Sequence, residues 1–195
     1  MMRRLAAAGI AAAALVAGAG VTVGYGLSTG FDRAADRADL PDVIARFDPE
    51  RELTRLRRRH VGFVFQAYHL VPELTGEENV LLPTRLPGSA RGAPARGRAL
   101  IERLGLNGAA ARLPHELSGG EQQRLAVARA LVHDPAVVLA DEPTGNLDAE
   151  AGAAVLGLLR GAADDGRAVV LVTHDEAATS AADRVLRLVE GRLEP

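Results

Sequence analysis

The chain has 195 residues, a length that suggests one domain or one domain with a small appendage. Hydrophobic residues make up 48% and charged residues 25%, a composition that excludes a disordered chain. The 23 basic residues nearly balance the 25 acidic ones, which excludes a strongly basic nucleic-acid-binding module, so we expect no nucleic-acid partner. Cysteine is absent, which excludes disulfides, thiolate metal sites and a cysteine nucleophile.

The start of the chain has the features of a membrane segment. After Arg3 and Arg4, residues 5–27 carry no charge, and as a helix they would extend about 35 Å, enough to cross a bilayer. We therefore predict a membrane helix within residues 1–27. The alternative is a secretory signal peptide, for which residues 17–19 (Ala-Gly-Ala) would provide a cleavage site of small residues.

The rest of the chain divides into two parts by composition. Residues 28–50 are polar, with alternating Asp and Arg, and we predict a linker or the remnant of another domain there. From residue 51 onward, helical patterns alternate with short apolar runs bounded by turn residues. This pattern is typical of an α/β domain with a largely parallel sheet, predicted over 51–195. The clearest predicted strands are 61–65, 136–140 and 168–173.

The most informative stretch is residues 117–124, with the sequence LSGGEQQR. Ser118 and, three positions later, Glu121 form the pattern of a capping box, so a helix should begin here. Gly119 and Gly120 leave the first backbone N–H groups of that helix accessible, and the positive end of the helix dipole favours an anion such as a phosphate. A capped helix alone needs only the Ser and the Glu, so the two glycines favour the anion site.

This stretch resembles the signature motif of the ABC-type ATPases, and further elements follow in that family's order. Residues 137–142 resemble a Walker B strand, which implies that Asp141 holds Mg²⁺ and that Glu142 polarises the attacking water as the general base. His174, which follows the predicted strand 168–173, resembles the switch histidine that contacts the γ-phosphate. Without the resemblance, an Asp-Glu pair after a strand is more commonly a solvated loop, and a lone His is usually structural.

Two more motifs carry the resemblance. Gln66 resembles the Q-loop glutamine, which in the family senses Mg²⁺ and the attacking water, and the segment 67–79 corresponds to the part that faces the membrane subunit. Asp148 ends an Asn-Leu-Asp string that resembles the D-loop between two nucleotide sites. The resemblance implies that these motifs bind ATP and Mg²⁺ together with the signature residues Ser118, Gly119, Gly120 and Glu121.

The strings FVFQAYHLVPELTGEENVLLP and LADEPTGNLD are similar to those of a narrower branch of the family. That branch serves lipoprotein release and macrolide or peptide export. The resemblance implies a partner permease with few membrane spans and a large extracytoplasmic domain.

The chain departs from the family in its phosphate-binding P-loop. The family's GxxxxGK[ST] string precedes the Q-loop, and this chain has neither that string nor a single lysine. In family dimers each nucleotide lies between the P-loop of one subunit and the signature motif of the other. We therefore predict a truncated P-loop NTPase-like fold, an α/β ABC nucleotide-binding domain with a mostly parallel sheet and a helical subdomain. It would be hydrolysis-deficient alone and would need a second ATPase subunit.

The amino-terminal part resembles the start of a partner permease. Residues 27–32 and 41–48 are similar to the exit of a first membrane helix into an extracytoplasmic domain, which suggests a permease start joined to an ATPase that lost its front. Arg3 and Arg4 favour a cytoplasmic amino terminus. A cytoplasmic carboxyl side is favoured by the larger cluster of Arg51, Arg55, Arg57, Arg58 and Arg59. We expect a location at the inner or plasma membrane, with the ATPase-like part on the cytoplasmic side.

The expected function is that of the ATP-binding subunit of an ABC transporter, which couples ATP binding and hydrolysis to export across a membrane. Two alternatives stay open. The first is a non-catalytic, membrane-tethered partner of a permease or of a complete ATPase. The second is a rearrangement product that folds poorly, because loss of the first βα unit exposes one face of the sheet and leaves an unpaired edge.

Overall fold

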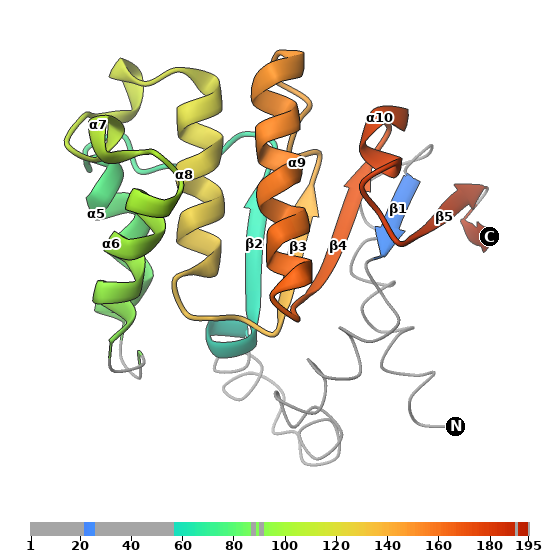
Figure 1. The fold of residues 1–195 in the computed structure, drawn as a ribbon, viewed down its shortest axis with the longest axis horizontal. Helices are drawn as coiled ribbons and strands as arrows, with labels where there is room; N and C mark the ends of the chain where they lie inside the picture. Colours follow the sequence, from blue (N-terminus) through green and yellow to red (C-terminus); the bar gives the residue numbers. More distant parts are fainter. Residues whose placement is uncertain (1–21, 26–56, 87–88, 90–91, 190, 195) are drawn as a thin grey trace.

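Six strands form one sheet in the computed structural model, which describes residues 22–25, 57–86, 89, 92–189 and 191–194 (Figure 1). The strands lie in the order β2-β3-β4-β1-β5-β6. Neighbours β2, β3 and β4 pair in parallel, whereas β1 pairs antiparallel to both β4 and β5. The strands are β1 (Thr22–Tyr25), β2 (Val61–Phe65), β3 (Val137–Asp141), β4 (Ala168–Thr173), β5 (Arg184–Val189) and β6 (Arg192–Glu194).

The prediction of a mostly parallel sheet is wrong for the sheet as a whole, because β1, β5 and β6 pair antiparallel and, among the described residues, only two of the five strand pairs, β2–β3 and β3–β4, are parallel. The three predicted strands themselves are parallel to one another, as expected. β2 and β4 have the predicted bounds, and β3 begins and ends one residue later than predicted. All six residues of β4 are buried, as expected for an apolar strand without polar alternation. The register sets Phe65 opposite Asp141, and Asp141 opposite Val172, so the carboxyl ends of the three strands lie together at one edge of the sheet.

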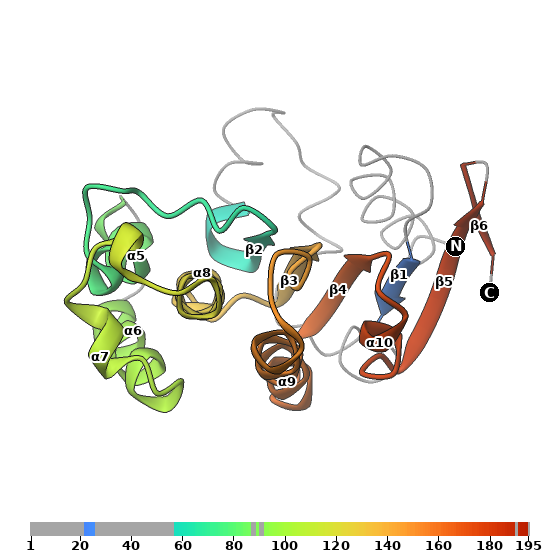
Figure 2. The ribbon, with the colours of Figure 1, turned by 90° about the horizontal axis from the view of Figure 1, so that it is seen from above.

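The helices form two groups (Figure 2). Helices α8 and α9 pack on one face of the sheet, and α5, α6 and α7 form a helical layer against α8 beyond the β2 edge. This arrangement corresponds to the predicted sheet with a helical subdomain. The helices are α5 (Gly76–Leu81), α6 (Ala93–Arg103), α7 (Asn107–Ala110), α8 (Gly119–Leu131), α9 (Ala149–Asp164) and α10 (Glu176–Thr179), with 3₁₀ helices η1 (Leu82–Arg85) and η2 (Pro114–Glu116).

The core lies between α8 and the sheet. Leu125 and Val127 of α8 are fully buried in one cluster with Val64 of β2 and Val138 of β3. Burial of each large apolar side chain stabilises the fold by about 1.5–3 kcal/mol. Because the core residues are aliphatic, mostly Val, Leu and Ala, close packing of α8 on the strands takes the place of the aromatic residues that the chain mostly lacks.

The segment after β2 is held by a buried amide. Asn79 of α5 is fully buried, and its Nδ2 donates to the carbonyls of Val71 (3.1 Å) and Leu74 (2.9 Å). Its Oδ1 accepts from the Val71 N–H at 2.7 Å. Thr75 and Glu78 form a capping box at the start of the same helix. These bonds fix the chain that leads from the sheet to the helical layer.

The predicted membrane helix of residues 1–27 can be compared with the structure only at residues 22–25, and there the prediction is wrong. Residues Thr22–Tyr25 form strand β1, not a helix, since two β-branched residues and a tyrosine favour an extended chain that can pair on both sides. The other residues of the predicted 1–27 helix and all of the 28–50 linker lie outside the described residues. Among the described residues, no helix is long and apolar enough to cross a bilayer.

Loss of the first βα unit is expected to leave one strand edge of the sheet unpaired and one face of the sheet exposed. Each of these two features is present only in part. Strand β1 pairs with the β4 edge that faces β5, so that edge is not open. On β2, Phe63 and Phe65 lie on the strand face opposite Val64, are 39% and 36% exposed, and stack with ring centroids 5.8 Å apart. Exposed apolar side chains also lie at the other edge of the sheet, where Val189 of β5 and Leu193 of β6 are 45% and 39% exposed.

Candidate functional site

Three loops meet at the carboxyl ends of the parallel strands. Gln66 follows β2, Asp141 and Glu142 end and follow β3, and His174 follows β4. In open α/β sheets this edge is where ligands bind. The fold therefore brings together four residues that the sequence analysis assigned to Mg²⁺, water and phosphate.

Glu142 and His174 form the central contact of this edge. The Glu142 carboxylate lies 2.7 Å from His174 Nδ1, and it also accepts from the His174 backbone N–H at 3.0 Å. Thr173 donates its hydroxyl to the second carboxylate oxygen at 3.2 Å. The Glu142 side chain is 16% exposed and that of His174 is 71% exposed. An oriented, half-buried carboxylate beside an accessible imidazole is suited to activate a water molecule.

Glu142 has a strained backbone. Its φ is 45°, in the left-handed region that non-glycine residues rarely adopt. The main chain around it is held by two bonds, from the Glu142 N–H to the Val172 carbonyl (2.8 Å) and from the Gly145 N–H to the Glu142 carbonyl (3.2 Å). Such strain at a functional position persists only where surrounding contacts fix it.

Asp141 suits a cation. Burial raises the pKa of this carboxyl, and the neighbouring Glu142 carboxylate raises it further. A bound cation would reverse both effects, so the donor set fits Mg²⁺. In the described part of the chain no three His, Asp or Glu side chains gather into a metal site made by protein alone, and Mg²⁺ would take further oxygens from phosphate and water.

Gln66 is joined to the loop that follows Glu142. Asn146 Nδ2 donates to the Gln66 carbonyl at 3.2 Å, and the two side-chain amides lie 3.5 Å apart. Gly145 permits this approach, because a Cβ at that position would lie 2.7 Å from Gln66 Nε2. The predicted Q-loop residue and the predicted D-loop string therefore meet in the structure.

The predicted capping box at the start of α8 is confirmed. Ser118 is the N-cap and accepts from the Glu121 N–H at 3.2 Å, while Glu121 accepts from the Ser118 N–H at 2.9 Å. The bond from the Ser118 backbone lowers the pKa of Glu121, and Arg112, whose guanidinium contacts this carboxylate, lowers it further. Glu121 is therefore ionised and serves the cap.

The two signature glycines lie against other parts of the chain. A Cβ on Gly119 would lie 2.9 Å from the Tyr68 hydroxyl, and a Cβ on Gly120 would lie 2.9 Å from Ala151 Cβ. Asp148 caps α9 by accepting from the Ala151 N–H at 2.8 Å. The signature and D-loop residues are thus neighbours. Within the described residues, no hydrogen bond joins the signature loop to the Glu142–His174 pair.

Sequence reasoning missed three polar residues of this region. Thr173 orients the Glu142 carboxylate, Gln123 bonds the main chain beside Gln66 and Glu142, and Arg129 bonds the turn after Gln66. Gln123 lies within the LSGGEQQR string, and Thr173 directly precedes the switch-like histidine. For Gln123 and Thr173, their position in or next to a motif was therefore the sequence signal that could have identified them.

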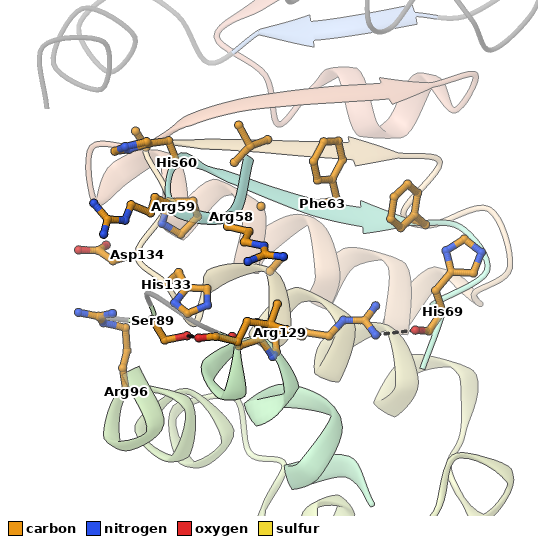
Figure 3. Close-up of a pocket in the computed structure, with 18 residues that line it drawn as sticks. Arg58, Arg59, His60, Phe63, His69, Ser89, Arg96, Arg129, His133 and Asp134 are labelled. Atoms are coloured by element: carbon orange, nitrogen blue, oxygen red, sulfur yellow. Dashed lines mark hydrogen bonds between the residues drawn. The ribbon is translucent and has the colours of Figure 1, made fainter. Parts of the chain in front are cut away.

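A second feature is a basic groove of about 770 Å³ between β2 and the helical layer (Figure 3). Its walls carry the exposed rings of Phe63 and Phe65, and Arg129 donates to the carbonyls of Tyr68 (2.7 Å) and His69. Its charged and titratable residues are Arg58, Arg59, His60, His69, Arg96, Arg129, His133 and Asp134.

The groove has a strongly positive lining. Asp134 is the single acidic residue among the described residues that line it, and its carboxylate pairs with Arg167 at 2.8 Å. Arg96 donates to the Val132 carbonyl at 3.0 Å, while Arg58 and Arg59 form no ion pair within the described residues. None of the residues assigned to ATP or Mg²⁺ lines this groove. It is therefore separate from the edge where Gln66, Asp141, Glu142 and His174 meet, which is termed the nucleotide edge after the role that the sequence predicts for it.

The family model described as "ABC transporter" matches residues 38–145, more than half of the chain. The Macrolide export ATP-binding/permease protein MacB 1/2 of Paracoccus denitrificans (strain Pd 1222) is 50% identical over 145 residues, which are 73% of this chain and 21% of that protein. The Pyoverdine export ATP-binding/permease protein PvdT of Pseudomonas aeruginosa (strain PAO1) is 45% identical over 153 residues, 77% of this chain and 23% of that protein. The chain spans about a fifth of the length of these relatives.

Two solved structures of the cassette MJ0796 are similar to the chain. The dimeric structure of this bacterial ABC transporter cassette has a TM-score of 0.61 and 40% identity, and covers 69% of this chain and 61% of that one. The dimeric post-hydrolysis state bound to ADP and Pi has a TM-score of 0.66 and 39% identity, and covers 76% of this chain and 67% of that one. The chain therefore belongs to the ABC transporter family, as an ATP-binding domain similar to those of the macrolide and pyoverdine exporters.

Proposed function

We propose that the chain is an ATP-binding component of an ABC exporter that completes a nucleotide site together with a second, P-loop-bearing subunit. The observation that carries this proposal is the Glu142–His174 pair at the carboxyl ends of β3 and β4. The capped signature loop at the start of α8 supports it independently, because it presents the helix end that the family turns toward a partner's nucleotide.

Each residue has a role in this proposal. Glu142 would accept a proton from the attacking water, and Thr173 and His174 orient its carboxylate for that task. His174, which is exposed, would contact the γ-phosphate, as the resemblance to the switch histidine implies. Asp141 and Gln66 would hold Mg²⁺, which when bound shields phosphate charge during transfer. Asp148 and the signature residues Ser118, Gly119, Gly120 and Glu121 would face the nucleotide of the partner subunit.

We infer that the chain alone does not hydrolyse ATP at an appreciable rate. Without lysine and without the GxxxxGK[ST] string, its 195 residues supply neither the backbone cradle nor the ammonium group that the family places on the β- and γ-phosphates. A partner with a P-loop would supply both at one site of a dimer. The dimeric state of the similar MJ0796 structures supports this arrangement.

A permease is the proposed membrane partner, and the basic groove is its proposed docking surface. The groove adjoins the segment 67–79 that the resemblance assigns to this contact, and the names of the relatives join an ATP-binding part to a permease part. Because the lining carries four arginines and stacked phenylalanines, a complementary segment would combine carboxylates with a large apolar side chain. The chain would then act on the cytoplasmic side of the inner or plasma membrane.

Nucleotide binding and phosphate release test the catalytic part. A ligand at 100 times its dissociation constant stabilises a protein by about 2.7 kcal/mol, so we compare the thermal midpoint of the full chain with and without Mg-ATP. We expect no shift for the chain alone and a shift when the MJ0796 cassette is added as the P-loop-bearing probe. Multiple turnovers by the chain alone, abolished by Glu142→Gln, would refute the proposal.

A non-catalytic, tethered partner is the second candidate, and it is favoured by the lack of lysine and of a GxxxxGK[ST] string in the sequence. Under this alternative, charge reversal by Arg58→Glu with Arg59→Glu would weaken binding to the permease part of the Paracoccus MacB relative, while Glu142→Gln would leave phosphate release by the mixed complex unchanged. The matched control is Arg184→Glu with Arg187→Glu, which reverses two exposed charges on β5, outside the groove. A Glu142→Gln complex that loses turnover would favour the catalytic role.

A further inference from the structure

Gln123 is a fully buried polar residue on α8 that the proposed roles leave unexplained. Its side-chain Nε2 donates two hydrogen bonds to main-chain carbonyls, to Pro143 at 2.8 Å and to Phe65 at 3.3 Å. These two carbonyls belong to different strand ends, one after β3 and one at the end of β2. A single amide therefore joins two loops that are far apart in the sequence.

Both carbonyls adjoin residues of the nucleotide edge. Phe65 directly precedes Gln66, and Pro143 directly follows Glu142. Glu142 has a φ of 45°, so its main chain depends on neighbouring contacts to keep this conformation. Pro143 cannot donate a backbone hydrogen bond, and its carbonyl is the group through which α8 holds this loop.

We propose that Gln123 is a positioning residue: by bonding the main chain next to Gln66 and Glu142, it fixes these two residues relative to each other. The roles of those two residues rest on the proposed function, whereas the arrangement itself can be tested without nucleotide. Only a terminal NH₂ group offers two donors in one plane at this side-chain length. The amide thus sets the spacing between the two loops, and neither a carboxylate nor a thioether can replace it.

Arg129 provides an internal comparison, because it holds the same turn from the same helix. Its guanidinium donates to the carbonyls of Tyr68 and His69, at the far end of the turn that begins with Gln66. Among the described residues, it makes no hydrogen bond to the loop after β3. Loss of Arg129 should therefore disturb the turn after β2, whereas loss of Gln123 should disturb both loops.

The test measures the Glu142–His174 contact by nitrogen-15 NMR of the full chain in detergent, at one pH. The His174 Nδ1 resonance reports its 2.7 Å contact with the Glu142 carboxylate. We expect Gln123→Met, which keeps the length of the side chain but removes both donors, to shift this resonance and to speed exchange of the Gly145 amide at least tenfold. Gln122→Met, on the neighbouring position of α8, and Arg129→Met should leave both signals as in the unchanged chain.

The outcome that overturns the proposal is a Gln123→Met chain that keeps the His174 resonance and the Gly145 exchange rate. If this variant does not fold, the proposal is tested in the unchanged chain by exchange of side-chain amide protons. The Gln123 side-chain amide protons should then exchange at least tenfold more slowly than those of Gln122, and equal rates overturn the proposal. Failure of the proposed function would instead appear in ATP binding and phosphate release, with the His174 signal still sensitive to Gln123.

Discussion

At its amino end α8 presents the backbone of Gly119 and Gly120 beside the Ser118 cap, whereas Arg129 in its last turn and His133 just beyond its carboxyl end line the basic groove. At the amino end the Glu121 carboxylate accepts from the Ser118 N–H, which places a negative charge there. At the carboxyl end the Arg96 guanidinium donates to the Val132 carbonyl, which places a positive charge there. Each charge complements the helix dipole at its own end.

This difference shows how one helix can serve two surfaces. The nucleotide edge and the groove share no described residue, yet both are built on α8 and on the turn after β2. The buried middle of the helix connects them rigidly. A change in the middle should therefore affect both ends, and a change at one end should stay local.

The largest effect is expected in the middle of the helix. Leu125 is fully buried and contacts the core between α8, α5 and the sheet. Leu125→Ala should lower the free energy of unfolding by about 2–5 kcal/mol, because it removes apolar contacts and leaves a cavity. Urea denaturation followed by circular dichroism measures this loss. A loss below about 1 kcal/mol would show that the two ends are not joined through this core.

A smaller effect is expected at the amino end. Ser118→Ala removes the acceptor for the Glu121 N–H and should cost about 1 kcal/mol of stability. Ser118→Asn, which retains a capping oxygen, is the matched control and should lose less. Denaturation midpoints of the two variants make the comparison. Equal losses would mean that the cap does not stabilise α8.

At the carboxyl end, Arg96→Met should cost about 0.5–1 kcal/mol, since a partly exposed hydrogen bond to Val132 is lost while the apolar stem is kept. Combined with Ser118→Ala, the two losses should add within about 0.5 kcal/mol, because the two ends of the 13-residue helix α8 are about 20 Å apart and share no partner. Unfolding of the double variant measures this. A clear departure from additivity would contradict the independence of the two ends.

The smallest effect is a pH dependence at the amino end. The capping bond and Arg112 lower the pKa of Glu121 below its ordinary value of 4.5, so its contribution to stability is present above that value. The contribution is lost as the pH falls below 4.5 through the lowered folded pKa. Glu121→Gln should therefore lose less stability than the unchanged chain between neutral pH and about pH 3. Parallel acid dependence of the two chains would contradict the prediction.

The sequence predicts those features of the fold that depend on local pattern. The apolar runs of β3 and β4 identify buried strands, and Ser118 with Glu121 identifies the first turn of α8, because these signals involve residues a few positions apart. The bonds from Gln123 to Phe65 and Pro143 cannot be predicted in this way. They join positions up to 58 residues apart and form only after the strands have taken their order.

The nucleotide edge shows the same division. The family resemblance identified Glu142 and His174, but not the left-handed backbone of Glu142 or the hydroxyl of Thr173 that orients it. Residues 22–25 were assigned to a helix because they end a long uncharged run. Two β-branched residues and a tyrosine favour an extended chain there, but the two distant strands with which it pairs have no local signal.

Strand β1 also has a consequence for the order in which the molecule assembles. Residues 22–25 precede both of their partners, β4 and β5, by roughly 150 positions. Closing so long a loop costs conformational entropy before any pairing compensates it, and contacts of this separation slow folding. Because β1 lies between β4 and β5 and pairs with both, these two strands belong to one sheet only after β1 has paired. We therefore expect β1 to pair after β2, β3 and β4 have done so, and the sheet between β4 and β5 to be completed late in folding.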